Sequence, residues 1–240
     1  MKRKSIALLL ALLLVLPMCA NAGGNYAYYA RHGDREVNQV AITIDDWWEP
    51  ALIPEFMAVA EKYGVKFTCY PSGCNIKVED GELWRSLLDA GHEIGSHGYQ
   101  HASMKTFNAE RFKKEYTKFE KALDEALGYH YEFLTVRLPY GSSEGTTGGG
   151  KTGRALHAAG FDHAVFWDYD KVNSVENAVK KIQNGSIVLI HANRHDLKYL
   201  EQLLEALSDK GFEYVTISQM FHITTRLVAD EPEDNPYWNK

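Results

Sequence analysis

The chain has 240 residues, of which 45% are hydrophobic and 24% charged, and its formal net charge at pH 7 is −6. This composition is ordinary for a globular protein, and the length suits one domain with a substantial core. The acidic balance argues against nucleic acid as a partner and fits a neutral or positively charged substrate.

The first 22 residues have the layout of a secretory signal peptide, with a basic start at 2–4, an apolar run over 6–16 and small residues at Ala20 and Ala22. The run is shorter than the ~20 apolar residues that span a bilayer. We therefore expect cleavage after Ala22, no membrane insertion afterwards, and a secreted or periplasmic protein. Cleavage removes three of the 26 basic residues and none of the 32 acidic ones, so the net charge becomes −9.

Short β-rich runs alternate with helical patterns through the central part of the chain. The expected strands cover 40–46, 65–71, 93–97, 133–139, 163–168, 186–192 and 214–220. Most of them have apolar residues at both odd and even positions, as parallel strands covered on both faces should have. Between them, helical patterns with polar starts and glycine stops cover 56–63, 80–91, 108–128, 174–185 and 197–211.

This alternation predicts parallel β/α units, arranged as an open sheet or a closed barrel, in one domain over 39–222. Residues 23–38 form an expected N-terminal arm, and 223–240 form an acidic tail with two prolines. In either architecture the site should form at the carboxyl ends of the strands.

Polar side chains stand at that end of five expected strands. They are Asp45 with Asp46, His97 with His101, Arg137, Asp168 and His191. Neighbours on a strand point to opposite sides, so the two adjacent carboxylates can take different roles. The two histidines are four residues apart and would share one metal ion on a helical turn, leaving the open position of a catalytic zinc site. Non-haem iron oxygenases use the same donors, but on antiparallel jelly-roll sheets, which this alternation does not resemble.

Four segments in this order resemble the motifs of the NodB-homology polysaccharide deacetylases, or carbohydrate esterase family four. They are 43–46, 97–101, 137–140 and 189–191. The resemblance covers most of the chain after the signal peptide and implies a distorted seven-stranded (β/α) barrel. It also implies a metal-dependent hydrolase that removes acetyl groups from an acetylated glycan, with an N-acetyl amino sugar polymer favoured over O-acetyl xylan.

The resemblance assigns the metal and the base. Asp46, His97 and His101 would hold a divalent metal, with zinc preferred and cobalt, nickel or iron also compatible. Asp45 would take a proton from the attacking water as general base. Arg137 would orient Asp45 and favour its charged form.

The resemblance also assigns the rest of the pocket. The backbone N–H of Tyr140 would stabilise the oxyanion. His191 would protonate the departing amine or alcohol. Leu189 and Pro139 would line the substrate pocket, Leu189 next to the acetyl methyl group.

The chain departs from the family pattern at three places. Trp47 and Trp48 follow the two aspartates where the family usually has glycine, and we expect at least one of them to face the substrate rather than pack under a loop. Gly98 stands where Ser or Thr is usual, so one hydrogen bond of that loop is expected to be missing.

The third departure is the fourth motif, at 170–174, which has Asn and Ser where the family has an acid and a tryptophan. Asp168 and Asp170 are then the candidates to orient His191. This departure also motivates an alternative function, a catalytically weak or inactive carbohydrate-binding protein of the same fold.

Two further features complete the expectations. Cys69 and Cys74 remain after export, and a short-range disulfide is expected in an oxidising compartment, with metal ligation or free buried thiols as alternatives. Residues 145–152 satisfy the phosphate-binding loop pattern literally, but 140–144 separate them from the preceding strand. We therefore expect a loop at the rim of the site and no nucleotide binding.

Overall fold

The computed structural model describes residues 25–170 and 174–227. The predicted signal peptide, residues 171–173 of the fourth motif and residues 228–240 of the tail lie outside these ranges. Within the described residues, no helix combines the length and the apolarity that a bilayer crossing requires.

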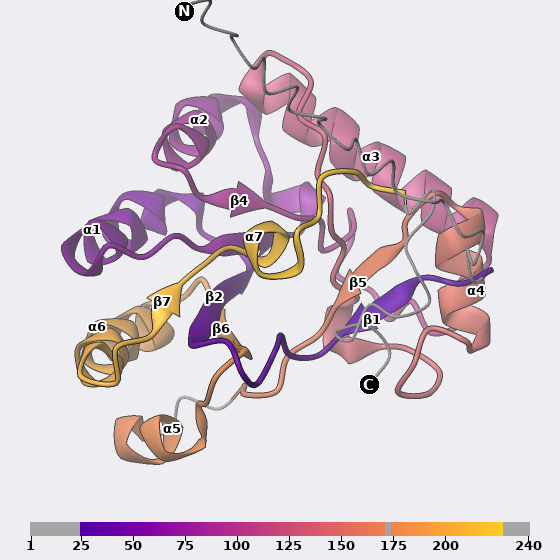
Figure 1. Cartoon of the computed structure of the whole chain (residues 1–240). Coiled ribbons are helices and arrows are strands. Elements are labelled where there is room, and N and C mark those ends of the chain that lie inside the picture. Colours follow the sequence, from indigo (N-terminus) through magenta and orange to yellow (C-terminus); the bar gives the residue numbers. More distant parts are fainter. Residues whose placement is uncertain (1–24, 171–173, 228–240) are drawn as a thin grey trace, which may run out of the picture.

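A parallel sheet with the strand order β4-β3-β2-β6 forms the centre of the fold, and β7 also pairs with β2 (Figure 1). Its strands are β2 (Gln39–Asp46), β3 (Thr68–Pro71), β4 (Glu93–Ile94), β6 (Ser186–His191) and β7 (Glu213–Tyr214). A second parallel pair is formed by β1 (Tyr28–Ala30) and β5 (His163–Val165). The predicted α/β class with parallel strands is confirmed.

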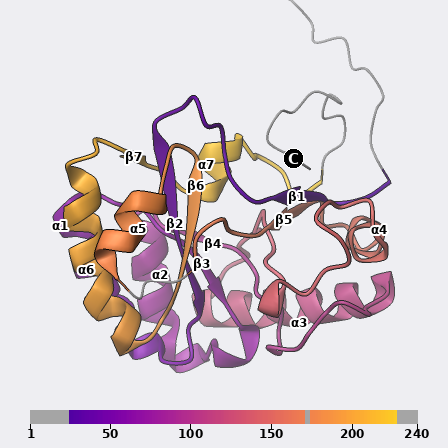
Figure 2. The same cartoon turned by 90° about the horizontal axis from the view of Figure 1, so that it is seen from below.

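The helices pack around the strands, and each contacts the next in the order α5, α6, α1, α2, α3 and α4. They are α1 (Ile53–Tyr63), α2 (Gly81–Asp89), α3 (Ala109–Leu127), α4 (Lys151–Ala158), α5 (Val175–Lys181) and α6 (Arg194–Ser208). Figure 2 shows α1, α5 and α6 on one side of the larger sheet and α4 at the opposite end of the molecule. The longer helices bury an apolar stripe, as in α6, where Leu200, Leu203, Leu204 and Leu207 are fully buried.

The expected strand over 133–139 is not formed. Only Val136 pairs there, through isolated parallel bridges to Ser96 on one side and Ala164 on the other. A third bridge joins Tyr169 to Val188. The described strands are therefore two sheets linked by single-residue bridges, and the closed barrel of seven strands that the resemblance implies is not observed.

The expected strand over 214–220 is also wrong, because β7 is only two residues long and a helix follows it. Thr216 caps α7 (Ile217–Phe221) in a reciprocal capping box with Gln219. Ile217, Met220 and Phe221 have helical spacing and are buried in a second hydrophobic cluster, which includes Tyr70 and Ile187. In Figure 1 this helix lies near the centre of the molecule, between the larger sheet and β5.

The predicted N-terminal arm contributes to the fold through β1. The glycine-rich segment packs against it, since a Cβ at Gly148 would lie 1.5 Å from the Ala27 carbonyl oxygen. The Thr152 hydroxyl accepts a hydrogen bond from the Glu144 N–H and donates one to the Lys105 carbonyl. Close packing thus accounts for the glycine and the threonine that give the segment its phosphate-loop appearance.

The predicted disulfide is not formed, and both cysteines are free thiols. Cys69 is on β3 and packs in the core cluster that includes the buried faces of the helices. Cys74 lies beyond the end of that strand, and its Sγ contacts the side-chain oxygen of Asn75 at 3.5 Å. The two thiols therefore occupy different surroundings despite their short separation in sequence.

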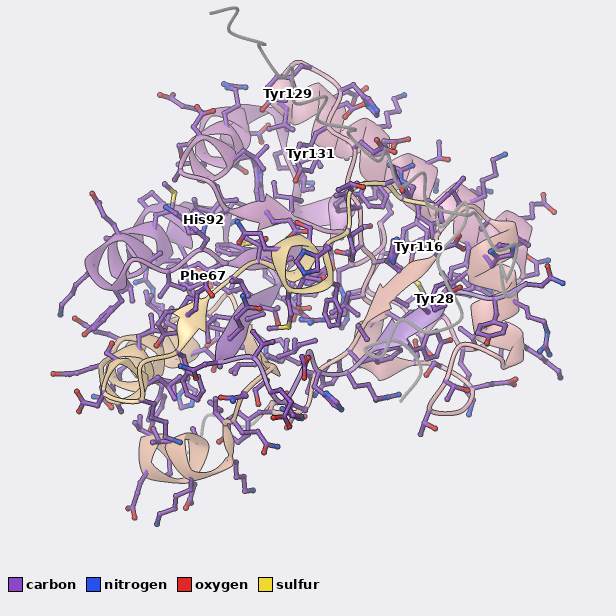
Figure 3. The ribbon with its side chains drawn as sticks, in the orientation of Figure 1. Tyr28, Phe67, His92, Tyr116, Tyr129 and Tyr131 are labelled. Atoms are coloured by element: carbon purple, nitrogen blue, oxygen red, sulfur yellow. The ribbon has the colours of Figure 1, made fainter. Side chains whose placement is uncertain are left out.

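Two buried histidines make stability depend on pH. His92 stacks on Phe67 with the ring centroids 5.2 Å apart, and its Nδ1 accepts the Phe67 N–H (Figure 3). His163 is equally buried on β5. Burial lowers the pKa of His92 to about 4, and likewise that of His163 to about 4.

The free energy of unfolding is expected to fall as the pH decreases from about 6.5, the ordinary pKa of histidine, to about 4. In this window the unfolded chain binds more protons than the folded one, so acid favours unfolding. The loss should reach up to about 3 kcal/mol for each histidine. Urea denaturation at several pH values measures it, and His92→Gln should reduce the slope. Equal stability at pH 7 and 4.5 would contradict this prediction.

Candidate metal centre and active site

The end of β2 is a strained turn that presents two carboxylates. Asp46 and Trp47 have φ angles of 72° and 54°, a region that residues other than glycine rarely adopt. The turn is held by neighbouring strands, because the Asp45 carbonyl accepts the Ala192 N–H and the Asp46 carbonyl accepts the Ser72 N–H. Such strain persists only where the surroundings enforce it, and it is concentrated at functional sites.

Asp46, His97 and His101 form a group that can hold one metal ion, with their ligand atoms all within 4.8 Å of one another. The Nε2 atoms of His97 and His101 lie 3.5 and 3.1 Å from Asp46 Oδ1. That oxygen is buried and accepts no hydrogen bond from any described residue. A buried carboxylate oxygen between two imidazole nitrogens fits a divalent cation, since each of the three would donate a lone pair.

The histidines reach the same point from a loop rather than from the expected helical turn. Gly98 has a φ of 78°, where other residues are strained, and a Cβ there would lie 2.2 Å from Met104 Cε, so this position favours glycine. The Glu115 carboxylate accepts the backbone N–H groups of Tyr99 (3.0 Å) and Gln100 (2.6 Å). This glutamate from α3, which sequence reasoning missed, fixes the loop that carries both histidines.

Both imidazoles are oriented by the segment at 137–140. His97 Nδ1 lies 2.8 Å from the Arg137 carbonyl oxygen, which can only accept a hydrogen bond. His101 Nδ1 lies 3.0 Å from the Tyr140 hydroxyl, which also donates to the His101 carbonyl. These contacts place the protons on Nδ1 and leave each Nε2 free to bind a metal.

The pKa shifts of His97 and Asp46 favour the protonation states that bind metal ions. Burial lowers the pKa of His97 below its ordinary value, although Asp45 and Asp46 oppose this shift. Burial alone would raise the pKa of Asp46, but the neighbouring imidazoles of His101 and His97 lower it overall. A neutral imidazole and an ionised carboxylate are the forms that coordinate cations.

Asp45 belongs to a separate buried pair. Arg137 is fully buried, and its Nη1 donates to Asp45 Oδ1 and to the Thr43 hydroxyl, each at 2.7 Å. Its remaining donors reach the carbonyl oxygens of Val165 and Phe166. The guanidinium thus holds the Asp45 carboxylate in place, with Oδ2 3.8 Å from His97 Nε2.

The residues expected to line the pocket are on segments next to the Asp45–Arg137 pair. Pro139 and Tyr140 follow Arg137 in the chain, and Leu189 is on β6, which pairs with the strand that carries Asp45. Tyr140 has a φ of 61° and is 70% exposed, and its ring meets that of His101 edge-on at 4.5 Å. Pro139 is buried at the start of the same short turn. Leu189 is the register partner of Thr43, so it shares the face of the sheet that carries Asp45.

Trp47 and Trp48 have different surroundings. Trp47 is fully buried against Phe56 and Trp84, and its Nε1 donates to the Ile44 carbonyl, so its predicted contact with substrate is wrong. Trp48 is 54% exposed, and its ring lies 5.7 Å from that of His101. Only Trp48 of the two stands at the rim.

His191, at the end of β6, is the register partner of Asp45. Its acidic partner is Asp196, with Oδ2 3.6 Å from His191 Nδ1, and not Asp168 or Asp170 as expected. Asp168 binds Arg35, Ser186 and the Ile187 N–H at the opposite end of β6. Among the described residues no ion pair joins Asp170 to His191. The sequence signal for Asp196 was the Asn193-x-x-Asp196 pattern of a helix start, directly after His191.

The fold and the site define an α/β protein with an Asp-His-His group that can hold a metal ion at the carboxyl ends of its strands. The family model described as polysaccharide deacetylase matches residues 32–163. The chain belongs to this family, the NodB-like or CE4 deacetylases. The resemblance first recognised in the four short motifs is therefore confirmed.

Individual relatives are similar at modest identity. A bifunctional xylanase/deacetylase of Pseudobutyrivibrio xylanivorans is 24% identical over 88% of this chain and 34% of its own length. The peptidoglycan-N-acetylglucosamine deacetylase PgdA of Listeria monocytogenes is 25% identical over 76% of this chain and 39% of its own length. The chain thus spans between a third and two fifths of these relatives. A crystal structure of a CE4 family pseudoenzyme from Bacillus anthracis shares the fold, with a TM-score of 0.68 and 21% identity over 80% of this chain and 68% of that one.

Proposed function

We propose that the protein is a metal-dependent deacetylase that hydrolyses acetyl groups of an acetylated glycan. The observation that carries this proposal is the Asp46, His97 and His101 group standing beside the separate buried pair of Asp45 and Arg137. The Asp46 carboxylate lies next to the imidazoles of His97 and His101, whereas the neighbouring Asp45 carboxylate pairs with a guanidinium. This division gives the site both a place for a cation and a distinct base.

A divalent cation held by the three ligands would polarise the acetyl carbonyl and acidify a water molecule, and zinc is the metal we propose ahead of cobalt, nickel or iron. Asp45 takes a proton from the attacking water, held in position by Arg137. The water oxygen bonds to the acetyl carbon, and the carbon–nitrogen bond then breaks. His191 gives its proton to the leaving nitrogen, so that acetate and an amine are released.

We further propose that the substrate is an N-acetyl amino sugar polymer met outside the cytoplasm. The exposed rings of Trp48 and Tyr140 beside His101 offer apolar faces on which a sugar ring can stack. Removing N-acetyl groups creates ammonium groups, which the acidic chain would not repel. The name of the Listeria relative and the signal-peptide pattern agree with this substrate class and with export after cleavage at Ala22.

A carbohydrate-binding protein without turnover is the second candidate, since the fourth motif lacks its acid and a pseudoenzyme shares the fold. Acetate release from N-acetylated chitooligosaccharides, peptidoglycan and acetylated xylan separates the candidates. We expect release from the N-acetylated glycans with added Zn²⁺ and its loss with chelator. Binding without release would favour the second candidate, and release from xylan alone would reverse the proposed substrate preference.

A further inference from the structure

The start of α6 places a carboxylate behind the histidine at the end of β6. Asp196 Oδ2 lies 3.6 Å from His191 Nδ1 and accepts the His191 backbone N–H at 2.7 Å. The Asp196 side chain is 16% exposed and that of His191 is 44% exposed. One oxygen therefore meets both the backbone and the ring of His191.

Asp196 is itself held in a defined position. Asn193 caps α6, and its side-chain oxygen accepts the Asp196 N–H at 2.9 Å. The carboxylate also lies in the first turn of a 15-residue helix, where the helix dipole favours negative charge. The contact with His191 thus comes from a fixed element rather than from a freely rotating surface side chain.

The other groups around His191 define its electrostatic surroundings. Asp45 and Asp46 act on it from β2 and Asp196 from α6, while His195 lies near Asp196. Contact with the Asp196 carboxylate raises the pKa of His191, although burial opposes this shift. The same contact helps to lower the pKa of Asp196 against the effect of burial. Asp196 is the member of this set that meets the Nδ1 side of the ring.

We propose that Asp196 is the positioning residue for His191, in place of the acid that the fourth motif lacks. This inference rests on the proposed deacetylase function. With Nδ1 turned to Asp196, the ring presents Nε2 to the leaving group. His191 then transfers its Nε2 proton to the nitrogen as the carbon–nitrogen bond breaks. It regains a proton from solvent, and Asp45 releases to solvent the proton taken from water.

The test compares Asp196→Asn with Glu205→Gln, which removes an exposed charge from the same helix. The Zn²⁺-loaded full chain is used, and NMR follows the titration of the His191 ring, assigned with His191→Gln. In Asp196→Asn we expect the titration midpoint to move to lower pH. We also expect kcat to fall at least about tenfold with little change in KM, and the alkaline limb of the pH–rate profile to shift the same way. Glu205→Gln should match the wild type.

Asp196→Glu keeps the charge and should retain the raised midpoint and recover much of the rate, which keeps the test decisive if the Asn variant folds poorly. An unchanged midpoint and pH profile in Asp196→Asn would overturn the positioning role. A wild-type protein that releases no acetate would instead refute the proposed function. The NMR titration would still decide the role of Asp196 in that case.

Discussion

Replacing Asp45 by Asn is expected to lower the rate of acetate release at least about a hundredfold, because it removes the proposed general base. Asn keeps the shape of the side chain and an oxygen that can accept from Arg137 Nη1. The three metal ligands are untouched, so binding of one divalent cation should persist. Single-turnover or steady-state acetate assays, together with a metal titration of the same sample, measure both results.

Asp168→Asn is the matched control for this variant. Asp168 is also an acid paired with an arginine, Arg35, but it lies at the far end of β6. Its replacement should leave the rate within about twofold of the wild type. Full activity of Asp45→Asn would show that another group takes the proton, and the assignment of the base would then be wrong.

Arg137→Lys is expected to destabilise the protein by roughly 1–3 kcal/mol and to impair catalysis, because the ammonium keeps the charge of this fully buried ion pair but leaves buried acceptors without their hydrogen bonds. The guanidinium makes four hydrogen bonds from one planar group and lies over the Tyr70 ring at 4.3 Å. An ammonium group cannot reproduce that geometry. Urea denaturation measures the loss of unfolding free energy.

The control for this change is Arg35→Lys at a more exposed pair, where the loss should not exceed about 1 kcal/mol. A loss below about 1 kcal/mol for Arg137→Lys would contradict the structural importance of the buried pair. It would also remove the reason for assigning to Arg137 the orientation of Asp45.

The elements that carry the metal ligands could be predicted because their signals are local. Apolar runs mark β2, β3 and β6, and the polar residues that follow them converge because parallel strands end at one edge of the sheet. This convergence and the spacing of the two histidines indicated a shared site, and the resemblance to the deacetylase motifs assigned Asp46, His97 and His101 as its ligands. The loop conformation at Gly98 corrected the local geometry without moving the ligands apart.

Features that depend on distant contacts were missed. Nothing local distinguishes Trp47 from Trp48, and only the packing of Trp47 against Phe56 and Trp84 decides which of them is buried. The pairing of β1 with β5 likewise joins segments that are far apart in sequence. Asp196 was overlooked because its role depends on the direction in which α6 leaves β6. The disulfide was wrongly predicted because cysteine spacing does not reveal that Cys69 is buried on β3 while Cys74 lies on the turn beyond it.

Cobalt titration of chelator-treated protein tests the central claim most directly, because it shows whether Asp46, His97 and His101 bind one cation together. We predict one equivalent of bound Co²⁺ with visible absorption bands, retained in Asp45→Asn and lost in His101→Ala and Asp46→Asn. No binding by the wild type, or equal binding by the ligand variants, would contradict the account.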